Sequence, residues 1–289
     1  MKLALLGSNG QLGQDILARA DRRFEIVPVS RAQLDVTDGE ALARLLPSLD
    51  ADVVVNATSY HRTDEAEDQA GLAVAVNAHA VQRMAEVCAR SGIRFVHVST
   101  DYVFSGIDRR QPYTETDAPG PLNVYGASKL MGESLAAISA PDALVLRVAS
   151  LFGVAGSSGK GGNFVETMLR LARERGEVRV VDDIVMSPTS TADLAGWLLD
   201  MVAAGAPPGT YHLVNSGLTS WCGFARAILS GAGLDAGVVA LASSDYPTRA
   251  RRPAFSALDN SKAAQTLGRE LAPWEDALER YLRAKGHRS

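Results

Sequence analysis

Cysteine is scarce in this sequence, and long apolar runs are missing from it. Of the 289 residues, only Cys88 and Cys222 are cysteines, and they lie far apart and outside any CxxC pair. This spacing argues against a disulfide framework or a zinc ribbon and suits a reducing compartment, so we expect two core thiols in a cytoplasmic protein. The N-terminal apolar run is too short for a signal peptide, and no later run approaches the roughly 18 apolar residues of a membrane-spanning helix. We expect no membrane partner.

An excess of charge of one sign is missing as well. The 29 Lys and Arg residues and 33 Asp and Glu residues give a formal net charge of −4, and no basic block stands out. Nucleic acid is therefore not expected as a partner. With 46% hydrophobic and 21% charged residues, the composition is that of a folded globular protein and excludes disordered, collagen-like and coiled-coil chains.

The first half of the chain alternates short apolar runs with amphipathic stretches, which is the pattern of βαβ units in a parallel sheet. Each run is about four to six residues long, as buried parallel strands are. Strands are predicted at residues 3–6, 25–29, 52–55, 95–99 and 143–148. The fold class is therefore α/β, with a doubly wound parallel sheet of the Rossmann type in residues 1–150.

After residue 150 the pattern changes. A glycine-rich loop at 153–162 precedes a predicted helix at 164–175, and a Pro-Pro-Gly turn precedes a predicted strand at 211–214. We expect residues 151–289 to form mainly a smaller C-terminal substrate-binding region, with the chain crossing back to the first domain. The proline-rich stretch 105–123 is long for a loop, and we expect it to act as a lid or binding loop.

The strongest local motif is a glycine-rich turn directly after the first predicted strand, where the first helix begins. Its glycines permit a tight turn, close approach of a pyrophosphate and packing of the helix on the strand, while the helix N-terminus offers amide donors. The motif predicts dinucleotide binding by residues 1–150. The residues expected to contact the cofactor here are Gly7, Asn9, Gly10, Gln11, Leu12 and Gly13.

The residues after the second predicted strand bear on the choice of cofactor. A carboxylate at this position binds the ribose 2′-hydroxyl of NAD, whereas an arginine accommodates the 2′-phosphate of NADP. Ser30 and Arg31 stand here, which favours NADPH. Asp35 and Val36, a few residues on, are expected to lie beside the adenine, so NADH stays possible.

Tyr125 and Lys129 form the second constellation, together with Thr100. A spacing of four puts the tyrosine and the lysine on one face of a helix. A cation about 4 Å away, at an effective dielectric constant of ~20, favours the phenolate by roughly 4 kcal/mol, so Lys129 is expected to lower the pKa of Tyr125 toward neutral pH. Thr100 lies at the carboxyl end of a predicted strand, where α/β sheets bind ligands, and is expected to hydrogen-bond a carbonyl group.

These motifs together resemble the extended short-chain dehydrogenase/reductase superfamily and, within it, the dTDP-4-dehydrorhamnose reductase family. The resemblance covers nearly the whole chain. It rests on the glycine motif, on STDYVF at 99–104, on PLNVYGASK at 121–129 and on RRP at 251–253. The STDYVF and NVYGASK strings are specific to the family. The RRP segment indicates the branch of the superfamily that acts on sugar nucleotides.

The resemblance implies an NADPH-dependent oxidoreductase that reduces the C4 ketone of dTDP-4-dehydro-L-rhamnose to dTDP-L-rhamnose. Tyr125 would give a proton to the C4 oxygen, Lys129 would hold the nicotinamide ribose, and Thr100 would polarise the ketone. Arg251 or Arg252 would meet the diphosphate or merely cap a loop. The cofactor would also be contacted by Asn56, Ala57, Thr58, Tyr125 and Lys129, and the nucleotide sugar by Thr63, Thr100, Asp101, Ser150, Asn163, Arg251 and Arg252.

The chain departs from the family at Ser150, where many members carry a tryptophan. A serine cannot stack on a sugar face as an indole does, so the exact substrate is the inference that this departure weakens. Metal-bridged dimers are known in the family, but Ser190, Thr191 and Ala192 supply no carboxylate, and the five histidines show no metal-ligand spacing. We therefore expect no metal, a monomer or homodimer, and only His61 among the histidines near the site.

Three other functions remain open at this stage. The chain would be a reductase of another nucleotide-4-keto-6-deoxy sugar, an epimerase or dehydratase that retains NAD, or a non-catalytic regulatory subunit resembling that of methionine adenosyltransferase. Arg31 argues against the second, as does the missing Asp-Glu pair after Thr100, where Asp101 is followed by Tyr102. The presence of Thr100, Tyr125 and Lys129 argues against the third.

Overall fold

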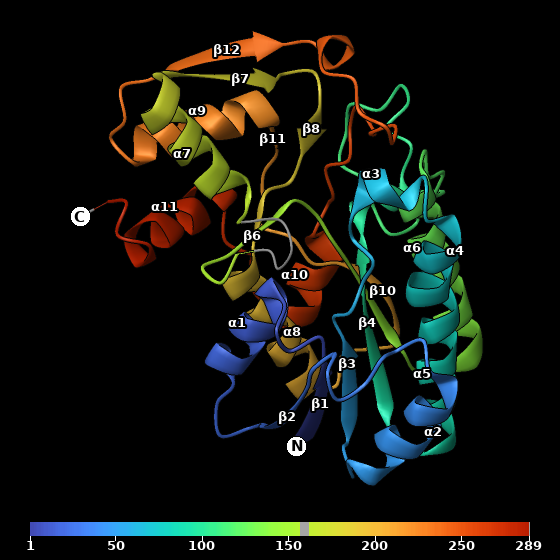
Figure 1. Ribbon diagram of the computed structural model, residues 1–289. Helices are drawn as coiled ribbons and strands as arrows, with labels where there is room; N and C mark the ends of the chain where they lie inside the picture. Colours follow the sequence, from blue (N-terminus) through green and yellow to red (C-terminus); the bar gives the residue numbers. More distant parts are fainter. Residues whose placement is uncertain (157–161, 289) are drawn as a thin grey trace.

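A computed structural model describes residues 1–156 and 162–288. Its centre is a parallel six-stranded sheet in the order β10-β5-β4-β3-β1-β2 (Figure 1). The strands are β1 (Lys2–Leu6), β2 (Glu25–Val29), β3 (Val53–Asn56), β4 (Arg94–Thr100), β5 (Leu144–Val148) and β10 (Gly209–His212). The sheet confirms the predicted doubly wound α/β class, and each predicted strand overlaps an observed one.

Helices cover both faces of this sheet because its strands are apolar on both sides. Leu3 and Leu5 of β1 belong to one core cluster, whereas Ala4 and Leu6 belong to the other. The first face is covered by α1 (Gln11–Arg19), α8 (Thr191–Ala203) and α10 (Ser261–Leu267). The second is covered by α2 (Gly39–Ser48), α5 (Ala80–Arg90) and α6 (Val124–Ser139).

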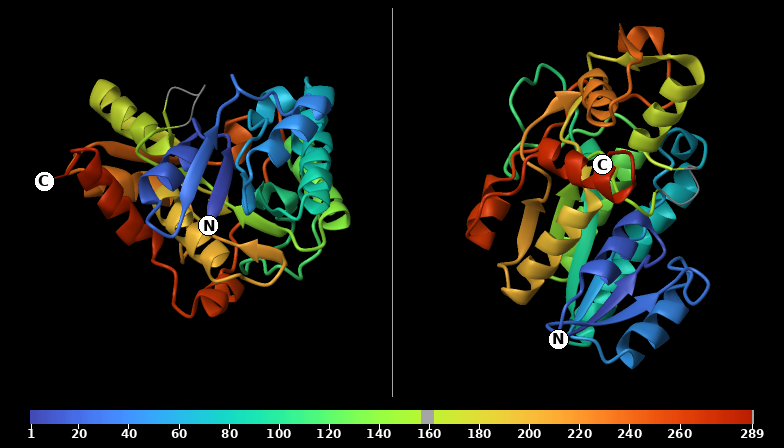
Figure 2. Two further views of the ribbon diagram at one scale, coloured as in Figure 1. Left: turned by 90° about the horizontal axis from the view of Figure 1, so that it is seen from below. Right: turned by 90° about the vertical axis from the view of Figure 1, so that its left-hand side faces the viewer.

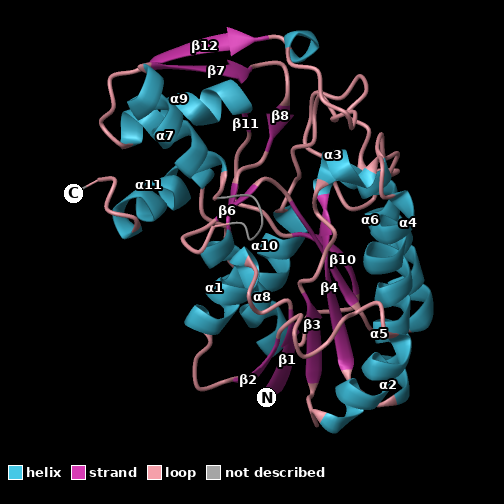
Figure 3. Cartoon of the chain, viewed as in Figure 1, coloured by secondary structure: helices cyan, strands magenta, loops and turns pink. Residues whose placement is uncertain are grey.

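A second lobe lies over the end of the sheet away from the N-terminus (Figure 2). Its core includes Phe152, Phe224, Trp274 and Tyr281, whose rings contact one another. Two strands far apart in the sequence, β7 (Glu177–Val181) and β12 (Gly237–Leu241), pair in parallel along its edge (Figure 3). Its helices are α7 (Phe164–Arg175), α9 (Trp221–Gly231) and α11 (Trp274–Ala284).

The chain crosses back from the second lobe to the central sheet between residues 191 and 213. In this stretch α8 packs beside α1, and β10 becomes the sixth strand by pairing with β5. The buried Trp197 anchors α8 in the core of the first lobe, while both cysteines are buried thiols, as predicted. No helix in the described part of the chain is both long enough and apolar enough to span a bilayer.

Short elements complete the described secondary structure. A π-helix (Ala75–His79) runs directly into α5, and 3-10 turns occupy Asp101–Val103 and Ser243–Asp245. The remaining elements are α3 (Thr63–Ala66), α4 (Ala70–Val74), β6 (Leu151–Phe152), β8 (Val185–Met186), β9 (Thr189–Ser190) and β11 (Thr219–Ser220). The predicted glycine-rich loop at 153–162 lies partly outside the described residues.

Candidate active site

The predicted site residues converge at the carboxyl edge of the sheet. The strand order places β2 on one side of β1 and β3 on the other, and such a reversal is where open α/β sheets bind ligands. Gly7 follows β1, Asn56 ends β3 and Thr100 ends β4 at this edge. The glycine motif and the Thr100 region therefore lie at the same edge of the sheet, on either side of β3.

The glycine turn is built so that side chains are excluded. Gly7 has a φ of +83°, and a Cβ there would lie 3.0 Å from the carbonyl carbon and oxygen of Ala57. A Cβ on Gly13 would lie 2.8 Å from Ser8 Cα and would overlap the Gly7 carbonyl oxygen. Gly10 is the N-cap of α1, and no side chain caps the first amides of that helix. The turn thus presents open N–H donors and a positive helix end, which fit a pyrophosphate.

The end of β3 shapes the opposite wall of this turn. The buried Asn56 accepts hydrogen bonds from the backbone N–H of Thr58 (3.0 Å) and from its hydroxyl (2.6 Å). These bonds hold residues 56–58 against Gly7. The segment predicted to run over the cofactor is therefore a fixed loop.

Arg31 is exposed just beyond the end of β2, with Ser30 half-buried beside it. Asp35, also exposed, accepts hydrogen bonds from the backbone N–H (2.9 Å) and hydroxyl (2.7 Å) of Thr37, which lower its pKa. The Asp35 carboxylate is therefore already engaged by its own loop. Val36 packs against the core beneath.

Thr100 and Tyr125 come together where β4 ends. The hydroxyls of Thr100 and Ser59 hydrogen-bond the Tyr125 phenol, and the Tyr102 ring contacts the Tyr125 ring edge-on at 5.9 Å between centroids. Burial is the largest influence on the phenol and raises the pKa of Tyr125 to about 12. Tyr125 is therefore a protonated group, held between two hydroxyls, at neutral pH.

Lys129 points back toward β4 in this structure. Its Nζ donates to the carbonyl oxygen of Val98 (2.6 Å) and lies 3.2 Å from His97 Nε2. Burial lowers the pKa of Lys129 to about 7. The expectation that Lys129 lowers the pKa of Tyr125 is not met here, because its amine contacts β4 rather than the phenol and burial outweighs other influences on Tyr125. The expectation that only His61 lies near the site is wrong, because His97 contacts Lys129.

Arg252 and Asp64 form a bidentate ion pair between the C-terminal segment and α3. Arg252 Nη1 and Nη2 donate to the two carboxylate oxygens at 2.5 and 2.7 Å, and Arg252 also hydrogen-bonds Tyr102. The guanidinium lowers the pKa of Asp64 to about 2. The buried Asp101 lies under this region, and burial raises its pKa to about 6 despite hydrogen bonds from Ser256 and Thr100.

Other predicted substrate residues lie around the junction in different settings. Asn163 is buried and fully engaged, because it caps α7 and donates to the Gly153 carbonyl (3.0 Å) and to the Tyr281 hydroxyl (3.1 Å). Arg251 is exposed. Ser150 has a φ of +44° between β5 and β6, and Thr63 begins α3.

The predicted lid at 105–123 is anchored near its middle. The Tyr113 backbone N–H donates to the Ala257 carbonyl (2.9 Å), and its ring stacks on Phe104 at 4.0 Å between centroids. The Gly106 N–H donates to the Tyr113 hydroxyl (2.9 Å). The loop is thus tied to the C-terminal segment that carries Arg252.

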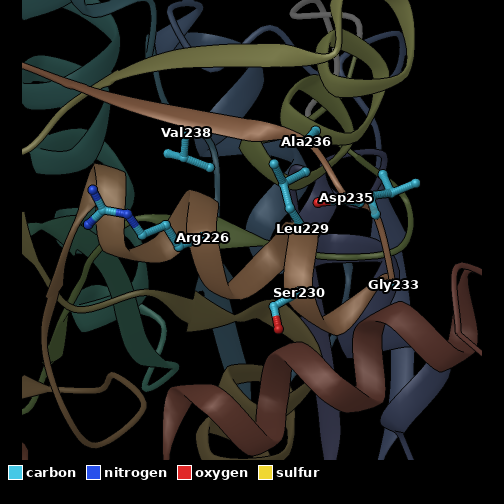
Figure 4. Close-up of a pocket in the computed structure, with 8 residues that line it drawn as sticks. Arg226, Leu229, Ser230, Gly233, Asp235, Ala236 and Val238 are labelled. Atoms are coloured by element: carbon cyan, nitrogen blue, oxygen red, sulfur yellow. The ribbon is translucent and has the colours of Figure 1, made fainter.

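A surface depression elsewhere lies between α9 and β12 (Figure 4). Arg226, Ser230 and Val238 are among its lining residues, and none of the predicted site residues lines it. Its side chains bring no predicted nucleophile, base or phosphate cradle together, so the chemistry belongs to the carboxyl edge of the sheet. Within the described ranges, no group of three or more His, Cys, Asp or Glu side chains could hold a metal ion.

The sequence analysis missed several residues that touch the predicted catalytic groups. Ser59 and Tyr102 contact Tyr125, Asp64 pairs with Arg252, and His97 contacts Lys129. A signal for one of them was present. Within the predicted strand 95–99, His97 and Ser99 are polar residues that alternate with apolar ones, which places both on the face that α6 covers.

Comparison with known proteins gives consistent matches along the chain. A family model described as the RmlD substrate binding domain matches residues 1–286. A dTDP-4-dehydrorhamnose reductase from Burkholderia thailandensis is 40% identical over 294 aligned residues, which cover 96% of this chain and 97% of that protein.

Solved structures agree with these matches. A crystal structure of a dTDP-4-dehydrorhamnose reductase from Clostridium acetobutylicum has a TM-score of 0.92 and 32% identity, covering 98% of this chain and 99% of the other. The dTDP-4-dehydrorhamnose reductase from Bacillus anthracis, solved in complex with NADP, matches with the same TM-score of 0.92, 32% identity and the same coverage of both chains.

Proposed function

Because this chain belongs to the dTDP-4-dehydrorhamnose reductase family, we propose that it is an NADPH-dependent oxidoreductase that reduces the C4 ketone of dTDP-4-dehydro-L-rhamnose to dTDP-L-rhamnose. The observation that carries this proposal is the hydrogen bond between Thr100 and Tyr125 at the carboxyl edge of the sheet. The Thr100 hydroxyl, which donates to Asp101 Oδ1, thus lies beside a protonated phenol at the end of the sheet where the glycine turn also lies.

The cofactor fits the residues that are present. NADPH, when bound, supplies the hydride that reduces the ketone. The uncapped N-terminus of α1 and the Gly7–Gly13 turn would hold its pyrophosphate, and residues 56–58 would line the other wall. Arg31 and Ser30 would meet the 2′-phosphate, since the Asp35 carboxylate is engaged by Thr37. NADH would bind more weakly because it offers Arg31 no phosphate.

The catalytic residues have separate tasks in this proposal. Thr100 and Tyr125 would both hydrogen-bond the C4 oxygen, and Tyr125 would give its proton to that oxygen as charge develops there. The pKa of about 12 keeps the Tyr125 proton in place until the oxygen becomes basic enough to take it. Lys129 would bind the nicotinamide ribose through its amine.

The nucleotide sugar would occupy the junction between the lobes. Asp101 and Thr63 lie near the sugar end in this proposal, and Ser150 takes the place of the aromatic residue of other family members. Arg252 would bind the diphosphate, in exchange for part of its ion pair with Asp64. Arg251 would add a second cation from the same segment, and Asn163 would support the Gly153 loop rather than the substrate directly.

The test is oxidation of NADPH at 340 nm with dTDP-4-dehydro-L-rhamnose made in situ from dTDP-glucose. We expect turnover with NADPH to exceed turnover with NADH. Tyr125→Phe should lower kcat by about 10²- to 10⁴-fold, since general acid catalysis contributes that much, while NADPH binding measured by fluorescence stays close to that of the wild type. Turnover retained in this variant would remove Tyr125 from the proposed role.

The alternatives give different results in the same experiment. Oxidation of NADPH only with another nucleotide-4-keto-6-deoxy sugar would point to Ser150 and a changed sugar pocket. Purified protein that already carries NAD would favour an epimerase or dehydratase. Stoichiometric capture of one partner enzyme, without turnover, would favour a regulatory subunit.

We further propose a division into residues 1–150, which bind NADP, and residues 151–289, which mainly bind substrate, apart from the stretch that returns to the sheet. The two separate buried thiols suit a cytoplasmic location, which cell fractionation tests. A monomer or homodimer is expected, and light scattering distinguishes the two.

A further inference from the structure

A buried polar chain connects α6 with the loop of residues 105–123. Arg147 on β5 donates to the Glu133 carboxylate on α6 at 2.7 Å, and its Nη1 lies 3.4 Å from His212 Nε2 at the end of β10. His212 Nδ1 lies 2.9 Å from the Tyr113 carbonyl oxygen in the loop. His212 is fully buried, and Glu133, Arg147 and Tyr113 are 5 to 6% exposed. The proposed function gives none of these four residues a task.

The arginine sets the direction of the bonds to His212. A guanidinium group can only donate, so His212 Nε2 accepts from Arg147. Burial, the largest influence, and the charge of Arg147 lower the pKa of His212 to about 3, although Asp259 opposes them, so the ring is neutral and carries one proton. That proton lies on Nδ1, which donates to the Tyr113 carbonyl. A proton on Nε2 would set two donors face to face and leave Nδ1 facing a carbonyl oxygen as a second acceptor.

The same loop covers the end of β10, which is the outer strand of the sheet. The backbone N–H of His212 donates to Glu115 Oε1 at 2.8 Å. The loop therefore holds both the ring and the backbone of His212. The Phe104 ring packs beside these contacts, stacked on Tyr113 at 4.0 Å between centroids and edge-on to the His212 ring at 5.7 Å.

The loop in turn holds the C-terminal segment that carries Arg252. The Tyr113 backbone N–H donates to the Ala257 carbonyl at 2.9 Å. Where the loop runs into α6, Asn123 Nδ2 donates to the Arg251 carbonyl at 2.8 Å. These two bonds lie on either side of Arg252, so a shift of the loop displaces this arginine.

We propose that His212 is a positioning residue for the nucleotide sugar. Its Nδ1–H fixes Tyr113 against the end of the sheet, and Tyr113 fixes the segment in which Arg252 would meet the diphosphate. The Arg147–Glu133 pair is the second member of this arrangement, because it selects the tautomer of His212 and joins it to α6. The effect on substrate rests on the proposed function, whereas the tautomer and the fixing of the loop do not.

Two substitutions separate the two sides of the imidazole ring. The side-chain amide of asparagine reaches the position of Nδ1, so His212→Asn keeps an N–H donor for the Tyr113 carbonyl and loses the acceptor for Arg147. Glutamine reaches the position of Nε2, so His212→Gln keeps the acceptor and loses the donor. Both variants remove the packing of the ring on Phe104. They therefore differ mainly in the bond to Tyr113.

The kinetic test measures NADPH oxidation with dTDP-4-dehydro-L-rhamnose. In His212→Gln we expect KM for the nucleotide sugar to rise about 5- to 10-fold, as the loss of one buried hydrogen bond implies, while kcat and NADPH affinity change less than about twofold. His212→Asn should keep KM within about twofold of the wild-type value. Equal KM values in the two variants would show a merely structural role for the ring and overturn the proposal.

A second test needs no substrate. Arg110 is exposed in the loop and is followed by Gln111, so trypsin can cleave the chain there. We expect cleavage after Arg110, followed by mass spectrometry, to be about fivefold faster in His212→Gln than in the wild type, because the loop opens more often. His212→Asn should be cleaved at close to the wild-type rate. Equal rates in all three proteins would refute the fixing of the loop by His212.

The tautomer of His212 is measured on the wild type, so this result does not depend on how the glutamine variant folds. Nitrogen-15 labelled histidine distinguishes the two neutral tautomers and the imidazolium, and the His212→Asn spectrum assigns the signals. We expect the Nδ1–H tautomer at pH 7, and an Nε2–H tautomer or an imidazolium would overturn the proposal. A wild type without turnover would contradict the proposed function alone, since proteolysis and the tautomer still decide the role of His212.

Discussion

At the scale of single residues, Lys129 works against the stability of the fold. Burial lowers its pKa from 10.5 to about 7, whereas an unfolded chain keeps this lysine protonated up to about pH 10. Between these two pH values the unfolded state binds more protons than the folded state. The stability contributed by this residue therefore increases as the pH rises from about 7 to about 10.

Lys129→Met should therefore stabilise the protein at pH 7 while abolishing its proposed activity. Replacing a buried charged group by an apolar one of similar volume is often stabilising by roughly 1–3 kcal/mol. Urea unfolding at pH 7 and pH 9.5 measures this difference, which should be smaller at the higher pH. A variant less stable than the wild type at pH 7 would show that the Val98 and His97 contacts outweigh the cost of burial.

Thr100 and Tyr125 could be predicted because each belongs to a local motif whose spacing implies its place on a strand end or a helix face. His97 could not be assigned to the site in the same way. Its contact with Lys129 depends on which helix covers which face of β4, and that pairing joins segments 32 residues apart. The direction of the Lys129 side chain could not be predicted either. Its amine donates to the backbone carbonyl of Val98, and no pattern of side chains in the sequence indicates a contact with a backbone group.

At the scale of secondary-structure elements, α6 is fixed to the sheet by a buried ion pair. Arg147 on β5 makes three hydrogen bonds to Glu133 on α6, and both residues are 5% exposed. Ser99 on β4 adds a second point of attachment. The helix that carries Tyr125 and Lys129 is thereby held in one register against two strands.

Arg147→Leu should destabilise the fold by about 3–5 kcal/mol, because it leaves the Glu133 carboxylate buried without its partner. The double variant Glu133→Leu with Arg147→Leu should recover most of that loss, since no uncompensated charge remains. Chemical denaturation of the two variants and the wild type checks both values. Equal losses in the single and double variants would mean that packing, rather than charge, dominates here.

The contact between α1 and the turn before it depends on the missing side chain at Gly13. Gly13→Ala places a methyl group against Ser8 and the Gly7 carbonyl, so we expect a loss of about 1–3 kcal/mol and weaker NADPH binding. Gly71→Ala in α4 is the matched control, because nothing lies within 4 Å of its added Cβ. This control should be neutral or slightly stabilising. Thermal melts and nucleotide titrations measure both effects.

The strands of the first half could be predicted from their apolar runs, but their order could not. The parallel pairing of β7 with β12 joins residues about 60 positions apart, and although β12 is apolar from Val238 to Leu241, its residues are exposed or only partly buried. The return of β10 to β5 also depends on packing of α8 against α1. Such long-range strand pairings depend on packing throughout the core rather than on any local run of apolar residues.

At the scale of the whole molecule, the Asp64–Arg252 pair ties segments 188 residues apart. The pKa of Asp64 is about 2 in the folded protein and about 3.8 in the unfolded chain. The contribution of this carboxylate is therefore complete above about pH 4 and is lost as the pH falls through about 2. Because Asp64 is half-exposed, solvent screening reduces the contribution to about 1 kcal/mol.

Asp64→Asn should lower the stability by about 1 kcal/mol at pH 7, and the difference should narrow as the pH falls from about 4 to about 2. It should also free Arg252 for a phosphate ligand, so nucleotide-sugar binding should tighten or stay unchanged. Asp68→Asn, which removes the more exposed ion pair with Arg249, is the control and should change stability less. Weaker substrate binding in Asp64→Asn would assign the carboxylate itself to the substrate.

The late return of β10 to the sheet has a consequence for synthesis. Until residues 209–212 leave the ribosome, β5 is the outer strand of the sheet, with one edge unpaired, although all five of its residues are buried in the finished protein. An apolar strand edge of this kind is a template for aggregation. The edge of β5 therefore stays exposed in the nascent chain while about 60 further residues are synthesised. Pauses in translation before residue 213 should make folding of the protein depend on chaperones.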